Sequence, residues 1–202
     1  MPLLAFSSSL GALKALVPLF TAGSFALFDI RPLATAETDE IETLLDAAFG
    51  SDRHGRTAYR IRQGMTAVPA LSFAAFDDSR LIGSLQTWPI ALVTDSSDPA
   101  FYPLKLVGPV AVLPERQRQG IGRALMERML VAADAGCEDA LVLIGDADYY
   151  DRLFGFSAVH TGRWQVPGPV DRARLLARLK SERLYGLSGM LGPALVDTEI
   201  LR

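Results

Sequence analysis

Cysteine and histidine are almost absent from this sequence. The single cysteine, Cys137, excludes an internal disulfide, and the two histidines, His54 and His160, lack clustered partners that could complete a metal site. We therefore expect no metal, and we expect Cys137 to be a buried or half-buried thiol without a chemical role. One unpaired cysteine is consistent with a reducing cytoplasm, which is the location we expect.

An excess of positive charge is also missing. The net charge is −3 and the pI is about 5.4, which gives no overall attraction to nucleic acid or to an anionic membrane. Hydrophobic residues make up 50% of the chain and charged residues 21%, so a sizeable core can form and general disorder is excluded. The 202 residues suit one ordinary α/β domain with an additional element at each end.

Charge is scarcest in residues 1–27, where Lys14 is the only charged side chain. Pro18 and Gly23 interrupt the helical spacing of its apolar residues, and the longest uncharged stretch is too short to indicate a membrane span. Three interpretations of this apolar N-terminal extension stay open: an over-extended N-terminus, an apolar helix covering its own domain or a second copy, and a targeting segment. We expect no membrane span, and a homodimer stays among the expected partners.

Alternating strand and helix signals follow from residue 28 onward. We expect strands at 28–33, 71–76, 81–93, 102–112 and 140–145, a hairpin turn at 77–80, helices after an N-cap at Thr35, at about 52–63, at 120–135 and at about 146–154, and short strands near FSAVHT and WQV. The uniformly apolar ALVLIG, 140–145, is typical of a strand covered on both faces. The order predicts a single mixed α/β sheet.

Residues 169–202 read as a C-terminal helical extension of a domain that covers 28–168. Leu175, Leu176 and Leu179 lie opposite arginines in DRARLLARLKSERL, a pattern typical of an amphipathic helix packed on the domain or on a partner subunit.

The hexapeptide QRQGIG, 117–122, lies where a strand is followed by a helix. Gly120 and Gly122 allow the backbone to approach a ligand, and the free N–H groups of a helix N-terminus favour a phosphate or pyrophosphate. A tight turn with glycines needed only for packing is the alternative. The segment is not a P-loop, because no Gly-Lys-Ser/Thr follows, and it lacks the GxGxxG dinucleotide fingerprint.

Two stretches in this order resemble the GNAT superfamily of N-acetyltransferases. VAVLPERQRQGIGRALM is similar to the acyl-CoA-binding motif, with Gln117, Gly120 and Gly122 at its fixed positions. VLIGDADYYDRLFGF, 142–156, resembles the strand and tyrosine-bearing helix that come next in the family. The resemblance covers about residues 28–165 and implies a single, mostly antiparallel, splayed central sheet flanked by helices.

The resemblance also implies where acetyl-CoA binds. Main-chain groups of Val110, Ala111 and Val112 would pair with the pantetheine as an added strand, beside a bend at Gly108-Pro109. The pyrophosphate would be held by amides of a segment that includes Gln117, Arg118, Gln119, Gly120, Ile121, Gly122 and Arg123. The co-substrate is then acetyl-CoA, and the acceptor is a small-molecule or protein amine.

The implied reaction is direct attack of an amine on the thioester in a ternary complex. We expect Tyr150, with Tyr149 second, to return a proton to the departing thiolate. This chain departs from the family pattern, because Tyr150 stands five residues before Gly155 where the family tyrosine commonly stands four before this glycine. Two aromatic residues that only pack under the helix are the alternative.

No general base is evident in the sequence. The strand 102–112 carries no carboxylate, and Asp146 is as well suited to cap the following helix as to accept a proton. Arg53, Arg56 and Arg60 fall on one face of the helix expected at 52–63, which predicts an acceptor or acyl carrier with a negative group. A solvated basic face is the alternative.

Two further functions stay open beside the enzyme. A non-catalytic acyl-CoA-binding module would share the fold, and the missing base and shifted tyrosine agree with it. A nucleotide-binding protein could use the same anion cradle, and ATP or NAD would then compete with CoA.

Overall fold

The computed structural model describes residues 28–194, which leaves the N-terminal extension and its three interpretations outside the described part. Its elements are β1 (Asp29–Pro32), α1 (Thr38–Phe49), α2 (Thr57–Ile61), β2 (Phe73–Asp77), β3 (Arg80–Thr94), β4 (Phe101–Val112), α3 (Ile121–Ala135), β5 (Ala140–Ile144), α4 (Ala147–Phe154), β6 (Trp164–Gln165), β7 (Leu175–Leu179) and β8 (Gly189–Pro193), with short 3-10 helices between them. No helix within 28–194 has the length and hydropathy needed to cross a membrane.

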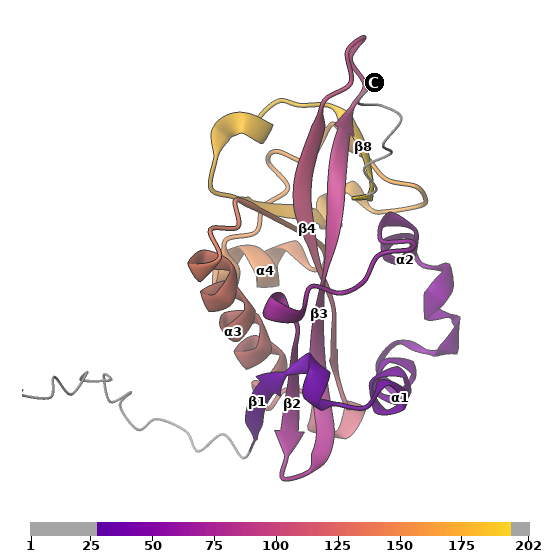
Figure 1. Cartoon of the computed structure of the whole chain (residues 1–202), viewed down its shortest axis with the longest axis vertical. Helices are drawn as coiled ribbons and strands as arrows, with labels where there is room; N and C mark the ends of the chain where they lie inside the picture. The colour runs from indigo at the N-terminus through magenta and orange to yellow at the C-terminus, as the bar shows by residue number, and fades with distance from the viewer. Residues whose placement is uncertain (1–27, 195–202) are drawn as a thin grey trace, which may run out of the picture.

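One mixed sheet organises the chain (Figure 1). The strand order along its main path is β1-β2-β3-β4-β5-β7. One edge of β3 pairs with β2 in its N-terminal half and with β8 in its C-terminal half. Only the β4–β5 and β6–β8 pairs are parallel; the other five pairs of named strands are antiparallel. The expected mixed, mostly antiparallel sheet flanked by helices is therefore confirmed.

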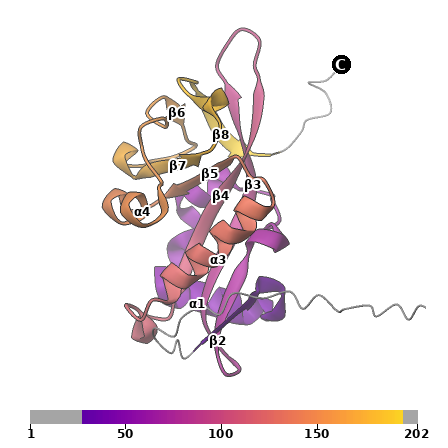
Figure 2. The same cartoon turned by 90° about the vertical axis from the view of Figure 1, so that its left-hand side faces the viewer.

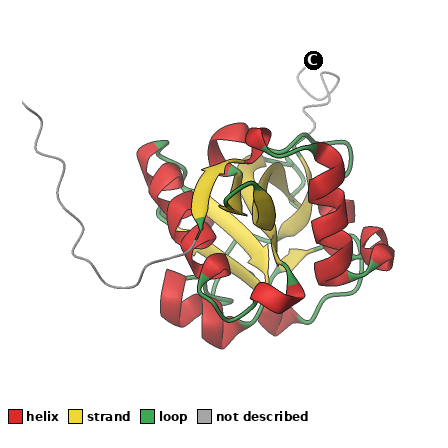
Figure 3. Cartoon of the chain, turned by 90° about the horizontal axis from the view of Figure 1, so that it is seen from below, coloured by secondary structure: helices red, strands yellow, loops and turns green. Residues whose placement is uncertain are grey.

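Helices cover both faces of the sheet. In Figures 1 and 2, α3 and α4 lie on one side of β3 and β4, and α1 and α2 lie on the other. The view from below shows the strands enclosed by helices (Figure 3). The apolar side of α3, through Leu125, Met126 and Met129, joins the largest buried cluster, whereas Leu44 and Leu45 of α1 join a separate cluster against β2 and β3. Burial of these helix faces supplies most of the force that holds the layers together.

The strand β5 is buried on both faces, as its uniform hydrophobicity predicts. Leu141 and Leu143 belong to the cluster under α3, whereas Val142 belongs to the cluster on the opposite face. β7 pairs with one edge along its whole length, and β4 pairs with the other edge at Leu141 and Val142. This strand anchors the C-terminal half of the sheet.

The prediction of a helix at 171–184 is wrong. Residues Leu175–Leu179 form β7, which pairs antiparallel with β5, and Gly189–Pro193 form β8, so this part contributes strands to the same sheet. Leu175 and Leu176 belong to different clusters on opposite faces, because side chains alternate along a strand. The leucine spacing resembles that of an amphipathic helix, but here these leucines lie in a strand that is buried on both faces.

Three local expectations also need correction. The region 52–63 is not one helix but a 3-10 turn, Ser51–Gly55, followed by the short α2. Thr35 does not cap α1; Glu37 caps it through a reciprocal capping box with Glu40. Cys137 is exposed rather than buried.

The late strands are shorter than the sequence indicates. Of FSAVHT, Ser157 alone takes part in strand pairing within the described residues, through a bridge to Ala177, and WQV reduces to the two-residue β6. The hairpin at 77–80 and the elements at 102–112, 120–135, 140–145 and 146–154 are confirmed within one or two residues at each end.

Candidate active site

The sheet opens between β4 and β5. These parallel strands pair only at Lys105–Leu141 and Leu106–Val142, and β5 then continues against β7 while β4 continues against β3. Where β4 leaves β5, Gln86 of β3 faces two residues, Gly108 and Pro109, which form a β-bulge. The bend predicted at Gly108-Pro109 is confirmed, and beyond it one edge of β4 lacks a partner strand in the described part of the chain.

Main-chain groups of alternate residues point into this opening. The amide of Leu113 donates to the carbonyl of Ile82 at 3.0 Å, so the groups of Leu113 and Ala111 face β3. The groups of Val110 and Val112 must then face the open edge. The structure thus leaves Val110 and Val112 free for pairing with a ligand, but not Ala111, whose side chain is also buried in the core.

A cavity of about 590 Å³ occupies the opening. Its walls come from residues 106–110 of β4, the end of β5, the start of α4, the region around α2, and the segment 169–174. This volume is within the range of small-molecule sites. The charged residues that line it are Arg53, Arg56, Arg62, Arg174, Asp146 and Asp171.

The first turn of α3 faces the same edge of β4. Gly120 begins the helix in the left-handed region at φ 83°, and Arg118 also has a positive φ of 62°. Within residues 28–194, the amides of Arg118 through Arg123 have no main-chain acceptor, and the first helical bond is from Ala124 to Gly120 at 2.9 Å. Six consecutive free N–H groups at the N-terminus of a 15-residue helix form a strong anion-binding geometry.

The side chains of this segment contribute less than the sequence indicates. Arg116 pairs with Asp77 at 2.7 Å and Arg123 pairs with Glu127 at 2.7 Å. Gln119 donates to the carbonyl of Glu115 at 3.4 Å, while Gln117 and Arg118 are exposed. Among the described arginines here, only Arg118 has no carboxylate partner, so the anion-binding capacity lies mainly in the main chain.

Tyr150 lies at the wall of the cavity. Its ring fits against Gly145, where a β-carbon would stand 2.4 Å from Cε2 of the tyrosine. Burial raises the pKa of Tyr150 to about 12, so the hydroxyl stays protonated at neutral pH. No residue within 28–194 forms a hydrogen bond with this hydroxyl. The hydroxyl oxygen is not fully buried either, so it is accessible to a ligand or to water.

Tyr149 does not share this environment. It is 37% exposed, packs edge-on against Tyr150 at 5.0 Å between ring centroids, and is not part of the cavity wall. Asp146 accepts a hydrogen bond from the amide of Tyr149 at 2.8 Å and thereby caps α4. The structure thus brings Tyr150, rather than Tyr149, to the cavity.

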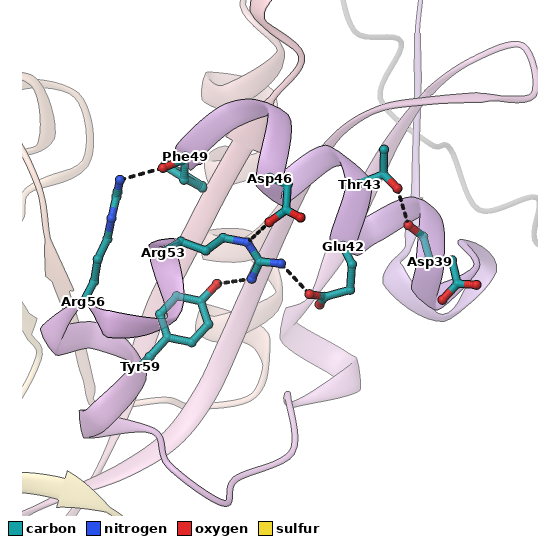
Figure 4. A network of polar contacts seen from close by, with 8 residues as sticks. All are labelled: Asp39, Glu42, Thr43, Asp46, Phe49, Arg53, Arg56 and Tyr59. Carbon is teal, nitrogen blue, oxygen red and sulfur yellow. Dashed lines mark hydrogen bonds and ion pairs between the residues drawn. The ribbon is translucent and has the colours of Figure 1, made fainter. Parts of the chain in front are cut away.

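Arg53 is a structural residue in this part of the fold (Figure 4). Only 2% exposed, it donates to Glu42 at 2.5 Å, Asp46 at 2.7 Å and the Tyr59 hydroxyl at 2.6 Å, which joins α1 to α2. Burial opposes the charge, but the bonds to Glu42, Tyr59 and Asp46 outweigh it and hold the pKa of Arg53 above its ordinary value. Its charge is therefore balanced by side chains of the protein.

The three arginines predicted to share a helical face do not do so. Arg56 donates to the carbonyl of Phe49 at 2.7 Å (Figure 4), and Arg60 donates to the carbonyl of Pro167 at 3.4 Å and is not part of the cavity wall. Arg62, which the sequence pattern does not single out, is instead buried beside the bulge, where its Nη1 donates to the Gly108 carbonyl at 3.1 Å. No sequence signal identifies Arg62, because its burial depends on the bulge of a distant strand.

No group of three or more histidine, cysteine, aspartate or glutamate side chains within residues 28–194 is arranged to hold a metal ion.

Comparison with known proteins identifies the family. Residues 29–159 match the family model described as an acetyltransferase (GNAT) domain. A curated relative, an uncharacterized N-acetyltransferase of Streptomyces avermitilis, is 27% identical over 143 residues, which is 70% of this chain and 34% of the relative. The chain thus spans about a third of the length of that relative.

Solved structures show the same fold. A GNAT family N-acetyltransferase (YhbS) of Escherichia coli, in complex with CoA, has a TM-score of 0.65 at 20% identity, over 86% of this chain and 93% of the other. A GNAT family acetyltransferase of Brucella melitensis, in complex with acetyl-CoA, has a TM-score of 0.52 at 24% identity, over 76% and 88%. Since the family model covers well over half of the sequence, this chain belongs to the GNAT acetyltransferase family.

Proposed function

We propose that this protein is an N-acetyltransferase that transfers the acetyl group of acetyl-CoA to a primary amine. One observation carries the proposal: the unpaired edge of β4 and the six free amides of residues 118–123 adjoin the same opening of the sheet. An extended chain that ends in a diphosphate would satisfy both sets of main-chain groups at once. The family and the CoA complex of the Escherichia coli protein support acyl-CoA as that ligand.

In this proposal each ligand part has its own set of groups. The pantetheine pairs with the main chain of Val110 and Val112, and the diphosphate accepts hydrogen bonds from the amides between Arg118 and Arg123. The thioester then lies near the bulge at Gly108-Pro109, where β4 borders the cavity. The acceptor amine enters the cavity from the side of α2.

The reaction forms a bond between the amine nitrogen and the acetyl carbon and breaks the bond from that carbon to sulfur. The ordered cleft reduces the entropy cost of the encounter. The amide of Val110, which faces the open edge, can donate a hydrogen bond to the developing oxyanion. Tyr150 donates a proton to the departing thiolate, and its raised pKa keeps that proton available at neutral pH.

The proton that the amine loses has no dedicated acceptor in this proposal. Two carboxylates line the cavity, Asp146 and Asp171, and each accepts a main-chain N–H at the start of a helical turn. Both are engaged as caps, so in this proposal the amine enters in its neutral form, and the proton that it loses when the amide forms passes to water.

A non-catalytic acyl-CoA-binding module is the second candidate. The observations that favour it are the absence of a carboxylate on β4 and the unusual spacing between Tyr150 and Gly155. Such a module would bind acetyl-CoA with the same main-chain groups and would release no CoA.

The test measures binding and turnover separately. Calorimetric titration with acetyl-CoA should show a single site, and release of free CoA should depend on added amine from a panel of small amines and peptides. Tight binding without CoA release from any amine supports the module. Failure to bind acetyl-CoA, or competition by ATP or NAD at equal affinity, overturns both candidates.

A further inference from the structure

Arg62 is a buried cation that forms no ion pair within the described part of the chain. Its side chain is 5% exposed, yet no carboxylate oxygen of residues 28–194 lies within 4.0 Å of its guanidinium. Arg53, which is similarly buried, has two carboxylates and a tyrosine hydroxyl. Burying an unpaired charge is costly, so an unbalanced buried arginine in a cavity requires an explanation.

Two aromatic rings and a main-chain carbonyl surround the guanidinium of Arg62. The rings of Tyr59 and Trp88 each lie 4.1 Å from the guanidinium carbon, while Nη1 donates to the carbonyl of Gly108. Aromatic rings attract a guanidinium, and a hydrogen bond with Tyr59 also favours the charged form of Arg62. The group is therefore fixed in orientation before any ligand arrives.

The side chain of Arg62 reaches the cavity. Arg62 is part of the cavity wall. Within the described residues, none of its nitrogens is both fully buried and without a hydrogen-bond partner. Burial, opposed by the contact with Tyr59, lowers the pKa of Arg62 to about 10, and the group stays charged at neutral pH. An oriented cation thus faces the space in which the acceptor would bind.

None of the cavity's own carboxylates neutralises this cation. Asp146 and Asp171 accept main-chain N–H groups at helical turns, and neither forms an ion pair with Arg62. Of the other three cations of the wall, Arg53 is paired with carboxylates, and Arg56 and Arg174 donate to main-chain carbonyls. The cavity therefore offers a fixed positive site to a ligand that brings its own negative charge.

We propose that Arg62, in contact with Tyr59, Trp88 and the carbonyl of Gly108, is a subsite for a carboxylate of the substrate. A carboxylate matches the planar fork of a guanidinium better than a single-point anion does. The subsite rests on the proposed function in one respect only: it assumes that the cavity holds the reactants. The carboxylate belongs either to the amine acceptor or to the far end of a dicarboxylic acyl group, since both would meet at the bulge.

The first measurement does not depend on turnover. Butyrate and butyramide differ in charge but not in shape, and binding of each to the full chain can be followed by calorimetry or by NMR line shifts. We expect butyrate to bind about tenfold more tightly than butyramide or better, as charge-assisted hydrogen bonds allow. Arg62→Met should abolish this preference, and Arg62→Lys, which keeps the charge but loses the fork, should keep only part of it.

A matched control is available on α3. Arg128 also lies over an aromatic ring, that of Phe73 at 4.7 Å, but it is exposed and is not part of the cavity wall. Arg128→Met should leave the butyrate preference at the wild-type value. Melting temperatures of all variants separate misfolding from loss of the subsite, and Arg62→Lys serves as the test variant if Arg62→Met does not fold.

The second measurement identifies the source of the carboxylate. With acetyl-CoA, kcat/KM for β-alanine is compared with that for β-alaninamide; with β-alaninamide as acceptor, succinyl-CoA is compared with acetyl-CoA. Each comparison gives a ratio of kcat/KM for the charged reactant to kcat/KM for the uncharged one. The ratio that falls by about tenfold or more in Arg62→Met, but not in Arg128→Met, shows which reactant carries the carboxylate. A butyrate preference that is absent, or that survives in Arg62→Met, overturns the subsite. An Arg62-dependent preference without any CoA binding keeps the subsite and refutes the proposed function.

Discussion

The ring of Tyr150 lies directly on the main chain of Gly145, so that a β-carbon at residue 145 would stand 2.4 Å from Cε2. Gly145 follows the last residue of β5, and Tyr150 lies in the second turn of α4. The contact therefore fixes the tyrosine hydroxyl relative to the opening between β4 and β5, because no other residue type leaves room for the ring there.

Gly145→Ala should displace Tyr150 without removing its hydroxyl. We expect kcat to fall by about a hundredfold, the scale of an ångström-sized misplacement of a catalytic group. The affinity for acetyl-CoA, measured by calorimetry, should stay within about twofold, because the diphosphate groups lie elsewhere. Gly162→Ala is the control, since a β-carbon there has no neighbour within 4 Å. Wild-type kcat in Gly145→Ala would show that the position of the ring is unimportant.

The two tyrosines should differ sharply when each hydroxyl is removed. Tyr150→Phe should lower kcat by at least about a hundredfold, a typical contribution of a positioned acid. Tyr149→Phe should change kcat by less than about threefold, since Tyr149 is exposed and lies outside the cavity wall. Steady-state assays of CoA release check both. A larger effect in Tyr149→Phe would reverse the assignment.

The raised pKa of Tyr150 gives a pH dependence with a definite sign. Because burial raises this pKa from 10.0 to about 12, the folded chain holds a proton between these values that the unfolded chain has lost. Stability from this group is complete below pH 10 and is lost as the pH approaches 12. Denaturant titrations at increasing pH should show a steeper loss for wild type than for Tyr150→Phe. Parallel curves would contradict the burial of this hydroxyl.

The affinity for acetyl-CoA should depend on the size of the side chain at residue 122. A β-carbon at residue 122 would lie 3.7 Å from Val112 and 3.9 Å from Val110, which is ordinary contact, so Gly122→Ala should bind acetyl-CoA nearly as wild type does. Gly122→Val adds bulk beside the free edge of β4 and should weaken binding by about tenfold or more, because in the proposed binding mode the pantetheine arm passes there. Calorimetry measures both affinities. Unchanged affinity in Gly122→Val would place the ligand elsewhere.

Arg53→Met should lower stability rather than affinity. The variant breaks the bonds to Glu42, Asp46 and Tyr59 that join α1 to α2. Both carboxylates are 48% exposed and can regain water, so we expect a loss of about 1–3 kcal/mol, below the usual cost of breaking a fully buried pair. Thermal melts should show a Tm lower by about 3–10 °C. Arg60→Met, which loses one exposed bond, is the control.

Much of the site was predictable from local sequence. QRQGIG indicates a helix N-terminus with free amides, and the structure confirms a helix that begins after Gly120. The pair Gly108-Pro109 predicts the break in strand pairing, which appears as a bulge. These features depend on residues that are near one another in the chain, and their backbone preferences act whatever surrounds them.

Other features could not be read in this way. Leu175 and Leu176 fit an amphipathic helix, but β5 offers them a strand partner buried on both faces, and packing outweighs the helical preference. The expected role of Arg53 in binding an anion also depended on its neighbours. Glu42 and Asp46 of α1 already occupy its donors, which spacing within 51–64 cannot show.

The sequence by itself determined the family motifs, the anion-binding turn at 117–122 and the layered α/β plan, because these follow from backbone preference and hydrophobic pattern within short segments. The tertiary structure alone decided which edge of β4 is open, that Tyr150 rather than Tyr149 reaches the cavity, and that Arg62 is buried there without a carboxylate. Each of these depends on contacts between residues far apart in the chain, and the free energy of such contacts is set by burial and pairing that no local pattern contains.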